Sequence, residues 1–517
     1  TDTLQAIYSN VELDFKEYNT AIKQAYEDSK KALKRILNDN NQTIDQFCNY
    51  LLEKVLILRV SVPKDTDLNH YFEIMNNRGE QLEKHEILKA NCLEIFKNDE
   101  NLSYSFNLIW EACSNIEKYV QYGFSVEQRN VIFGNNDWNT LNCKDIEDIT
   151  DNLSRLKKNE KSTLDATEQT LEHLINLPQI NEPKPEDEDT PDRFNTVINF
   201  SNFLLHVLRI QTKKDIPLDD KRLIELFDPY LKNSDSKKVT EFVKLFGFNL
   251  LKCKFLFDKY VIKREFLKGT DRWSLKQLRW YASKKVSYVN TFGESTENES
   301  ENRSILMLLS MFHVSTPTLV YKHWLNAALK YVFETPSINS NNYKIYLENL
   351  TKAFLYDRFI SNKQIDYYEI IYTNNGIQLN TDINEGLLNK GTAIENFIFN
   401  YLDYLLWKKE SEYSDFEFTF RSSVEHYYPQ NPIEGNEKID NDLLDNFGNL
   451  CLISRSKNSI LSNYMPQAKK EHYLNSTSID SIKQRIMMKE TNWGKDEIIK
   501  HGESMKKVLM HDRNNIE

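Results

Sequence analysis

The sequence predicts a mainly α-helical multidomain protein, with a partial α/β domain at its N-terminus and a ββα unit near its C-terminus. Three observations predict this fold class. The chain has 517 residues, more than one ordinary core accommodates, so we expect two to four domains. Apolar residues recur at helical spacing over most of the chain. Strand-like runs of β-branched and aromatic residues interrupt that pattern near residue 60 and after residue 415.

The N-terminal region is expected to be helical with one strand. Residues 1–40 have apolar residues at helical spacing and no Pro or Gly. The run LLEKVLILRVSV at 51–62 becomes β-branched, which predicts a helix that passes into a buried strand. A helix, a tight turn at 77–79 and a second helix at about 83–96 follow. Gly79 suits the turn because glycine tolerates positive φ.

The middle of the chain is expected to be helical throughout. Its strongest helical runs are 193–210, 221–231, 241–262 and 304 to about 407. Two polar stretches without apolar periodicity are expected to be linkers: an acidic, Pro-rich one near 178–193 and a second one near 293–303. We therefore expect domains at residues 1–100, 101–302 and 303–517.

Composition sets limits on the class of protein. A hydrophobic content of 40% and a net charge of −11 are typical of a soluble globular protein and do not favour nucleic-acid binding overall. The stretch Arg455–Arg513 has twelve Lys and Arg against seven Asp and Glu, which indicates either a polyanion partner or a solvated helix face. The six cysteines form no CxxC pair, and no apolar run is long enough to span a membrane. We expect a cytoplasmic protein without structural zinc or membrane contact.

Two segments near the C-terminus predict a strand, a loop, a second strand and a helix. They read RSSVEHYYPQN at 421–431 and FGNLCLISRSKNSILSN at 447–463. A neutral histidine such as His426 can deprotonate a water near pH 7. Glu425 and an Asn carbonyl offer the oxygen ligands that Mg²⁺ prefers. A further Asn on the second strand can bond the other ring nitrogen or a nearby backbone group. Together these residues suit phosphodiester hydrolysis.

These segments resemble the HNH nuclease domain of the GmrSD-type modification-dependent (type IV) restriction enzymes. The resemblance implies that His426 is the general base, Asn449 the orienting Asn, and Glu425 a metal-side carboxylate. It also implies a second metal ligand at Asn458, with Asn463 as the alternative. The further matches are Pro429, Gln430, Asn431 and, in the following helix, Lys469. The alternative reading of His426 is an ordinary structural histidine in a strand.

A second motif, YFEIMNNRGEQLEKHEILKAN at 71–91, resembles the F-E-x-x-N-x-R-G segment of the family's N-terminal domain. That domain has a ParB/sulfiredoxin-like core that binds and hydrolyses nucleotide. The matching residues are Phe72, Glu73, Asn76, Arg78 and Gly79. Asn76 and Arg78 suit phosphate binding, with Glu73 beside them. A capped helical hairpin with a surface arginine is the alternative.

The family's upstream Asp-Gly-Gln-Arg signature does not occur in this sequence. Either that portion is absent from this chain or it has diverged, so we expect weak or undetectable nucleotide hydrolysis. The whole pattern predicts a bacterial defence nuclease that cuts or nicks phage or modified DNA with Mg²⁺ or Mn²⁺. Two alternatives stay open: a nucleotide-sensing, DNA-binding regulatory subunit without nuclease activity, and an RNA-directed HNH toxin. A homo-oligomer also stays open.

Overall fold

The structure is a computed structural model, and its description covers most of the chain. The described residues are 20–40, 42–55, 83–164, 193–267, 269–281, 285–293, 299–373, 382–461, 463–474 and 480–513. The chain forms two compact units, Thr1–Lys64 and Asp65–Glu517. Within the described ranges no helix has both the length and the hydropathy of a transmembrane span.

In its described residues, 20–40 and 42–55, the first unit has the helices α2 (Thr20–Asp39) and α3 (Ile44–Lys54). A capping box starts α3, because the Thr43 side chain accepts from the Gln46 backbone N–H while the Gln46 side chain accepts from the Thr43 backbone. The helix predicted over 1–40 is confirmed in its described part. The strand predicted before residue 62 lies outside the described residues, as do Phe72, Glu73, Asn76, Arg78 and Gly79.

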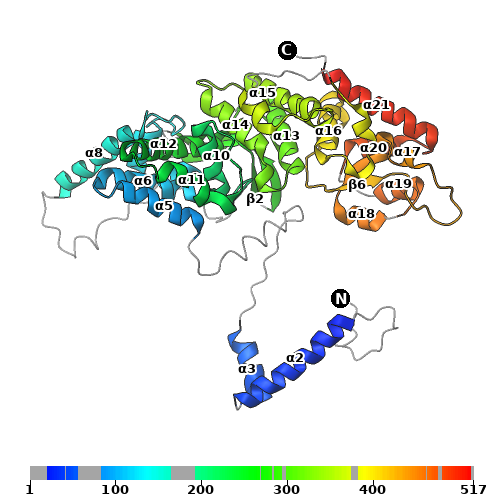
Figure 1. The fold of residues 1–517 in the computed structure, drawn as a ribbon, viewed down its shortest axis with the longest axis horizontal. Coiled ribbons are helices and arrows are strands. Elements are labelled where there is room, and N and C mark those ends of the chain that lie inside the picture. The colour runs from blue at the N-terminus through cyan, green and yellow to red at the C-terminus, as the bar shows by residue number, and fades with distance from the viewer. Residues whose placement is uncertain are drawn as a thin grey trace. The chain divides into compact units, whose positions relative to one another are not determined.

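The second unit is mostly helical, as the sequence predicts. Its first part comprises α5 (Lys84–Ile95), α6 (Glu100–Ser114), η1 (Val120–Gly123), α7 (Val126–Phe133), α8 (Ile146–Leu164), β1 (Phe194–Thr196), α10 (Phe200–Thr212), η2 (Asp220–Arg222), α11 (Leu223–Leu231), α12 (Ser236–Tyr260), β2 (Lys263–Leu267), β3 (Thr270–Ser274), β4 (Lys276–Tyr281) and β5 (Lys285–Asn290). Figure 1 shows α5, α6 and α8 at one end of this unit.

The second part of this unit is also helical, with one short pair of strands. It comprises α13 (Glu299–Ser315), η4 (Leu319–Tyr321), α14 (His323–Glu334), α15 (Ser340–Ala353), the π-helical η5 (Phe354–Phe359) and η6 (Glu369–Thr373), η7 (Glu385–Asn389), η8 (Gly391–Ala393), α16 (Asn396–Lys409), η9 (Ser411–Tyr413), β6 (Ser423–His426), α17 (Asn441–Leu444), η10 (Phe447–Asn449), β7 (Leu450–Ile453), α18 (Arg455–Leu461), α19 (Pro466–Leu474), α20 (Ile482–Lys489) and α21 (Lys495–Arg513). Elements β6 and α17–α21 lie at the opposite end of the unit from α5 (Figure 1).

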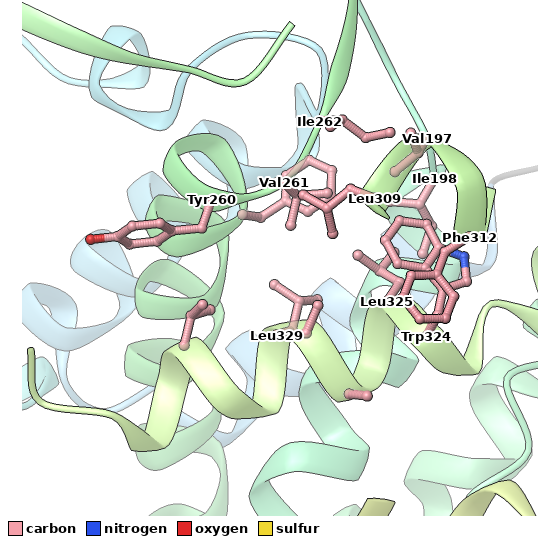
Figure 2. Close-up of a cluster of buried hydrophobic side chains, with 14 of the residues drawn as sticks. Val197, Ile198, Tyr260, Val261, Ile262, Leu309, Phe312, Trp324, Leu325 and Leu329 are labelled. Carbon is pink, nitrogen blue, oxygen red and sulfur yellow. The ribbon is translucent and has the colours of Figure 1, made fainter. Parts of the chain in front are cut away.

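A continuous apolar core holds the helices of this unit together (Figure 2). Phe312 of α13 stacks on Trp324 of α14 with ring centroids 5.9 Å apart. Leu325 and Leu329 of α14 are also buried in this cluster, as is Ile262. Each fully buried Leu or Phe contributes about 1.5–3 kcal/mol relative to exposure, so this cluster is a major stabilising contribution.

The sequence analysis expected only helices in the middle of the chain, and this is wrong for residues 194–196, at the start of the predicted run 193–210, and for the strands within 263–290. Strands β1, β2 and β3 form one antiparallel sheet, and β4 pairs with β5. The strands were missed because the inward positions of β2 carry charge: Lys263 and Glu265 are buried, while the intervening Arg264 is less so. A strand whose buried face is charged has no apolar alternation to detect.

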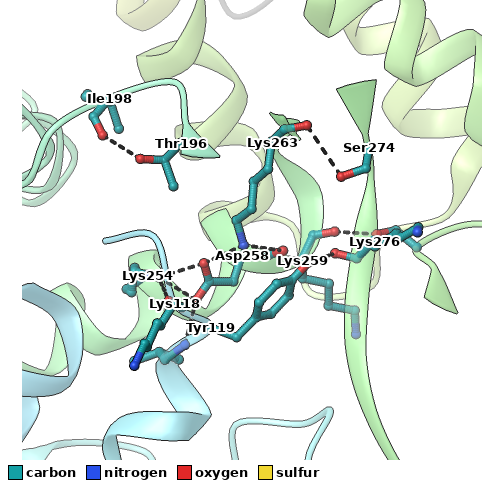
Figure 3. A network of polar contacts seen from close by, with 12 residues as sticks. Lys118, Tyr119, Thr196, Ile198, Lys254, Asp258, Lys259, Lys263, Ser274 and Lys276 are labelled. Atoms are coloured by element: carbon teal, nitrogen blue, oxygen red, sulfur yellow. Dashed lines mark hydrogen bonds and ion pairs between the residues drawn. The ribbon is translucent and has the colours of Figure 1, made fainter. Parts of the chain in front are cut away.

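Ion pairs compensate the buried charges of this region (Figure 3). Asp258 at the end of α12 accepts from Lys254 Nζ at 2.6 Å, from Lys263 Nζ at 2.8 Å and from the Val120 backbone N–H at 2.7 Å. Burial lowers the pKa of Lys263 to about 8. One carboxylate thus joins α12, η1 and β2, and loss of Asp258 would leave the buried Lys254 and Lys263 without their shared counter-charge.

The linker expected near 293–303 is wrong in its second half, because α13 begins at Glu299. Asn302 is buried, accepts from the Phe292 backbone N–H at 3.1 Å and donates to the Leu275 carbonyl at 3.3 Å. From the sequence alone, a polar residue such as Asn302 indicates a loop, because its burial and its bonds to the backbone are visible only in the structure. Of the linker predicted near 178–193, only Arg193 belongs to the described residues. The boundaries at 100 and 302 stay predictions.

A close approach of backbones holds α21 against η10, and Gly448 permits it. A Cβ atom on Gly448 would lie 1.9 Å from the Ile498 carbonyl and 2.7 Å from the Gly502 backbone N.

We expect Gly448→Ala to lower the free energy of unfolding by about 2–3 kcal/mol, because backbone atoms cannot rotate away as side chains do. Thermal melting measures the loss. Gly494→Ala is the control, since its Cβ would meet only the Glu497 carboxylate at 3.4 Å, and equal losses would contradict this account.

Candidate active site

The two strands of the C-terminal motif form an antiparallel pair. In the register of β6 and β7, Glu425 lies opposite Cys451 and His426 opposite Leu450. Helix α18 follows β7 directly, so the predicted order of strand, loop, strand and helix is observed. The strands occupy only residues 423–426 and 450–453 of the two quoted segments, 421–431 and 447–463. Just after β6, the Tyr427 backbone N–H bonds the Asn449 carbonyl at 2.8 Å, and the Tyr428 backbone N–H bonds the Asn449 side chain at 2.7 Å.

A buried arginine anchors this pair of strands to the helical core. Arg421, just before β6, donates to the Asp403 carboxylate at 2.8 Å and to the Asn400 side chain at 2.5 Å, both on α16. Asp403 also accepts from the Lys483 backbone N–H at 2.9 Å. These bonds fix α16, the strand of His426 and α20 to one another. The candidate site is therefore built on rigid elements.

Lys483 bonds the backbone where β7 begins. Its ammonium donates to the Phe447 carbonyl at 2.7 Å and to the Leu450 carbonyl. Burial lowers the pKa of Lys483 to about 7, against an ordinary value near 10.5. A neutral lysine amine can still donate hydrogen bonds, so the Phe447 and Leu450 carbonyls remain suitable partners when Lys483 loses its charge.

This pKa shift predicts a pH dependence of stability. Above about pH 7 folded Lys483 loses its proton, whereas the unfolded chain keeps it until about pH 10.5. The unfolded state then binds more protons, so the Lys483 contribution to stability rises with pH over this window and falls as pH drops through 7. We therefore expect the difference in unfolding free energy between wild type and Lys483→Met to change in favour of wild type, by up to about 1.4 kcal/mol per pH unit between pH 7.5 and 9. Urea unfolding of both proteins measures this, and a flat difference would contradict it.

His426 ends β6 with its ring mostly covered. Its side chain is 13% exposed, and Nε2 lies 2.9 Å from Oδ1 of Asp445, directly after α17. Sequence reasoning missed Asp445. The signal available was a carboxylate four residues before Asn449, in the segment that leads into the partner strand of His426. No periodicity marks such a residue, so only the strand pairing reveals the contact.

Glu425 points to the other side of β6, because successive side chains of a strand alternate. Its Oε1 accepts from the Lys469 ammonium at 2.5 Å, and the same ammonium donates to the His426 carbonyl at 2.7 Å. The Lys469 side chain is 0% exposed and that of Glu425 9%. Burial raises the pKa of Glu425, and the Lys469 charge opposes the rise.

Asn449 organises the backbone after His426. Its amide donates to the Tyr428 and Leu444 carbonyls at 3.1 and 3.0 Å, and its Oδ1 accepts from the Tyr428 backbone N–H and from Trp493 Nε1. The residue is fully buried. Of the two contacts expected for this Asn, the structure has the backbone contact and none to the imidazole ring.

The two candidates for the third HNH residue lie in different surroundings. Asn458, on α18, is partly buried and its amide donates to the Ser423 hydroxyl at the start of β6. Ser423 and Glu425 are two positions apart on a strand, so Asn458 approaches the Glu425 side of β6. Asn463 is exposed, and among the described residues no hydrogen bond of its side chain is recorded.

The residues predicted as metal ligands, Glu425 and Asn458, can be judged by the donor atoms that they offer. Among the described residues, no three His, Cys, Asp or Glu side chains cluster as a metal site. Glu425 and Asn458 supply one carboxylate and one amide oxygen on the same side of β6. That set fits a hard cation that keeps most of its waters, such as Mg²⁺ or Mn²⁺, and does not fit zinc. The Asn458 amide nitrogen faces Ser423, which leaves its carbonyl oxygen as the donor.

The C-terminal region matches restriction endonucleases. Residues 380–508 match the family model described as GmrSD restriction endonucleases, C-terminal domain. This range contains η8, β6, α17, β7 and α18. A search of curated proteins gave no match to the chain. The family match supports the GmrSD-type resemblance of the motifs and a restriction endonuclease role, which implies DNA as the substrate. The ParB/sulfiredoxin-like N-terminal domain stays a prediction.

Proposed function

We propose that residues around β6, β7 and α18 form an HNH-type, ββα-metal nuclease centre that hydrolyses DNA phosphodiesters. The observation that carries this proposal is His426 at the end of β6, directly after the buried carboxylate of Glu425, with the Asn449 amide bonded to the backbone of Tyr428 two residues later. A general base, a metal-side carboxylate and an orienting amide are what hydrolysis by a metal-assisted water requires.

In this proposal His426 accepts the proton of the attacking water. The Asn449 bonds to Tyr428 fix the backbone two residues after His426, which would limit the movement of the strand end that carries the ring. Fixed placement of a base lowers the entropic part of the barrier. His426 is partly exposed, which gives a water and a phosphate access to it.

Glu425 and Asn458 would hold the cation. Bound Mg²⁺ or Mn²⁺ supplies charge neutralisation at the phosphate and at the leaving oxygen. The Lys469 ammonium, 2.5 Å from the Glu425 carboxylate, opposes the rise in the Glu425 pKa that burial causes and so favours the ionised form. Asn458 is favoured over Asn463 by its place beside Ser423.

DNA is favoured over RNA as the substrate by the description of the matched family. The positive balance of Arg455–Arg513 adds an attraction for a polyanion around α18–α21. We propose that the DNA is foreign or modified and that the N-terminal half recognises it. Nucleotide binding through Glu73, Asn76 and Arg78 stays a prediction, as does regulation by nucleotide.

Supercoiled plasmid and a long RNA, incubated in parallel with the purified chain and Mg²⁺, test the proposal. We expect nicked or linear plasmid and intact RNA. Cleavage of RNA alone would favour the RNA-directed toxin. Plasmid binding without cleavage, at any concentration of Mg²⁺ or Mn²⁺ and with modified plasmid, would favour the regulatory subunit and overturn the proposal.

A further inference from the structure

We propose that Asp445 is a positioning residue for His426, and that Gly391 in η8 sets the position of the Asp445 carboxylate. This inference rests on the proposed nuclease function and adds two residues to it. The contact that carries it is the 2.9 Å distance between His426 Nε2 and Asp445 Oδ1. No other side chain among the described residues is recorded in a hydrogen bond to this ring.

The chemistry of the contact selects one tautomer. A neutral imidazole has one N–H, and an ionised carboxylate only accepts. Nε2 therefore carries the hydrogen that Asp445 accepts, which leaves the lone pair on Nδ1 to take a proton from water. Once Nδ1 is protonated, the nearby carboxylate also stabilises the imidazolium. An acceptor on the distal nitrogen is a common way to fix which nitrogen reacts.

Gly391 limits where the carboxylate can go. Its φ is +57°, and a Cβ built on it would lie 2.4 Å from Asp445 Oδ1 and 3.1 Å from Oδ2. The backbone of η8 thus covers the carboxylate on one side. On its own segment, Asp445 is fixed by its backbone N–H, which donates to the Asn441 carbonyl at 2.9 Å. His426, Asp445 and Gly391 come from three separate segments, so this arrangement is a property of the fold.

Substitution of Asp445 tests the positioning role. We expect Asp445→Ala to lower kcat for plasmid cleavage by about 10- to 100-fold with KM nearly unchanged, as is typical when the partner of a reacting histidine is lost. Asp445→Asn should recover part of the rate, because its amide oxygen still accepts from Nε2. Asp442→Ala is the control: it removes the same charge from the exposed surface of α17. Equal kcat in Asp445→Ala and wild type, or a loss confined to KM, would overturn the inference.

Substitution of Gly391 tests the same geometry without changing a polar group. Gly391→Ala should displace the carboxylate and lower kcat as Asp445→Ala does. Gly435→Ala is the control: Gly435 also has a positive φ, +94°, so alanine is strained there too, but nothing lies within 4 Å of its added Cβ. If Gly391→Ala cuts plasmid at the wild-type rate while remaining folded, Gly391 does not set the carboxylate.

A tautomer measurement separates this inference from the proposed function. With ¹⁵N-labelled histidine at about pH 8.5, where imidazoles are neutral, the His426 ring should show a protonated Nε2. The chain has ten histidines, and His426→Ala identifies the relevant signals. Asp445→Ala should give mixed tautomers. Unchanged tautomers in Asp445→Ala would overturn the inference even if the nuclease is active. A fixed Nε2–H tautomer in a protein that cuts nothing would instead overturn only the proposed function.

Discussion

We expect His426→Ala to lower DNA cleavage by about 10²- to 10⁴-fold, the usual effect of removing a general base. The ring touches Asp445 and is partly exposed, so its removal leaves the helical core and the Lys469 ion pair in place. DNA affinity should therefore stay near the wild-type value. Folding should also be preserved, because the backbone after residue 426 is held by Asn449 and not by the imidazole.

Single-turnover cleavage of supercoiled plasmid measures this effect, and binding to the same DNA in EDTA measures affinity. His472→Ala is the matched control, because His472 is exposed on the neighbouring helix α19. It should cut at the wild-type rate. If His426→Ala also cuts at that rate, the nuclease centre lies elsewhere and the base assignment is wrong.

The second large effect is expected for Glu425→Gln. Removal of one charge from a buried ion pair leaves the Lys469 ammonium without its counter-charge, which typically costs about 3–5 kcal/mol of unfolding free energy. Removal of the carboxylate should also raise the Mg²⁺ or Mn²⁺ concentration for half-maximal cleavage by at least about tenfold. Asn458→Ala should shift the metal dependence in the same direction.

A double variant separates these two effects. Glu425→Gln combined with Lys469→Met contains no unpaired buried charge, so it should regain most of the stability but none of the metal affinity. Glu471→Gln, an exposed carboxylate on the same helix as Lys469, is the control and should change neither. Identical metal titrations for wild type and Glu425→Gln would rule out the proposed ligand.

The sequence was most informative where residue types are tied to backbone contacts. The strands around Glu425 and Cys451 and the following helix were predicted because aromatic and β-branched residues alternate there. The contact of Asn449 with backbone was one of two expected arrangements. The pairing of Lys469 with Glu425 agrees with a match in the motif, but its geometry needed the tertiary structure, since 44 residues separate the two.

The parts that could not be predicted depend on contacts between distant segments. Strand β2 was missed because the charged residues Lys263 and Glu265 occupy its buried positions, where Lys263 is paired with Asp258. Asp445 has no pattern of its own and gains its significance from His426. Gly391 is similar: its positive φ matters because a carboxylate from another segment lies against it. Such residues become visible only when the fold brings them together.

Metal-dependent cleavage of plasmid by the purified wild-type chain tests the central claim most directly. Supercoiled plasmid is incubated first in EDTA and then with Mg²⁺ or Mn²⁺ in excess, beside His426→Ala purified in the same way. The account predicts intact plasmid in EDTA, nicked or linear plasmid after the metal is added, and intact plasmid with the variant under both conditions. Cleavage that persists in EDTA, or cleavage by the variant equal to wild type, would contradict it.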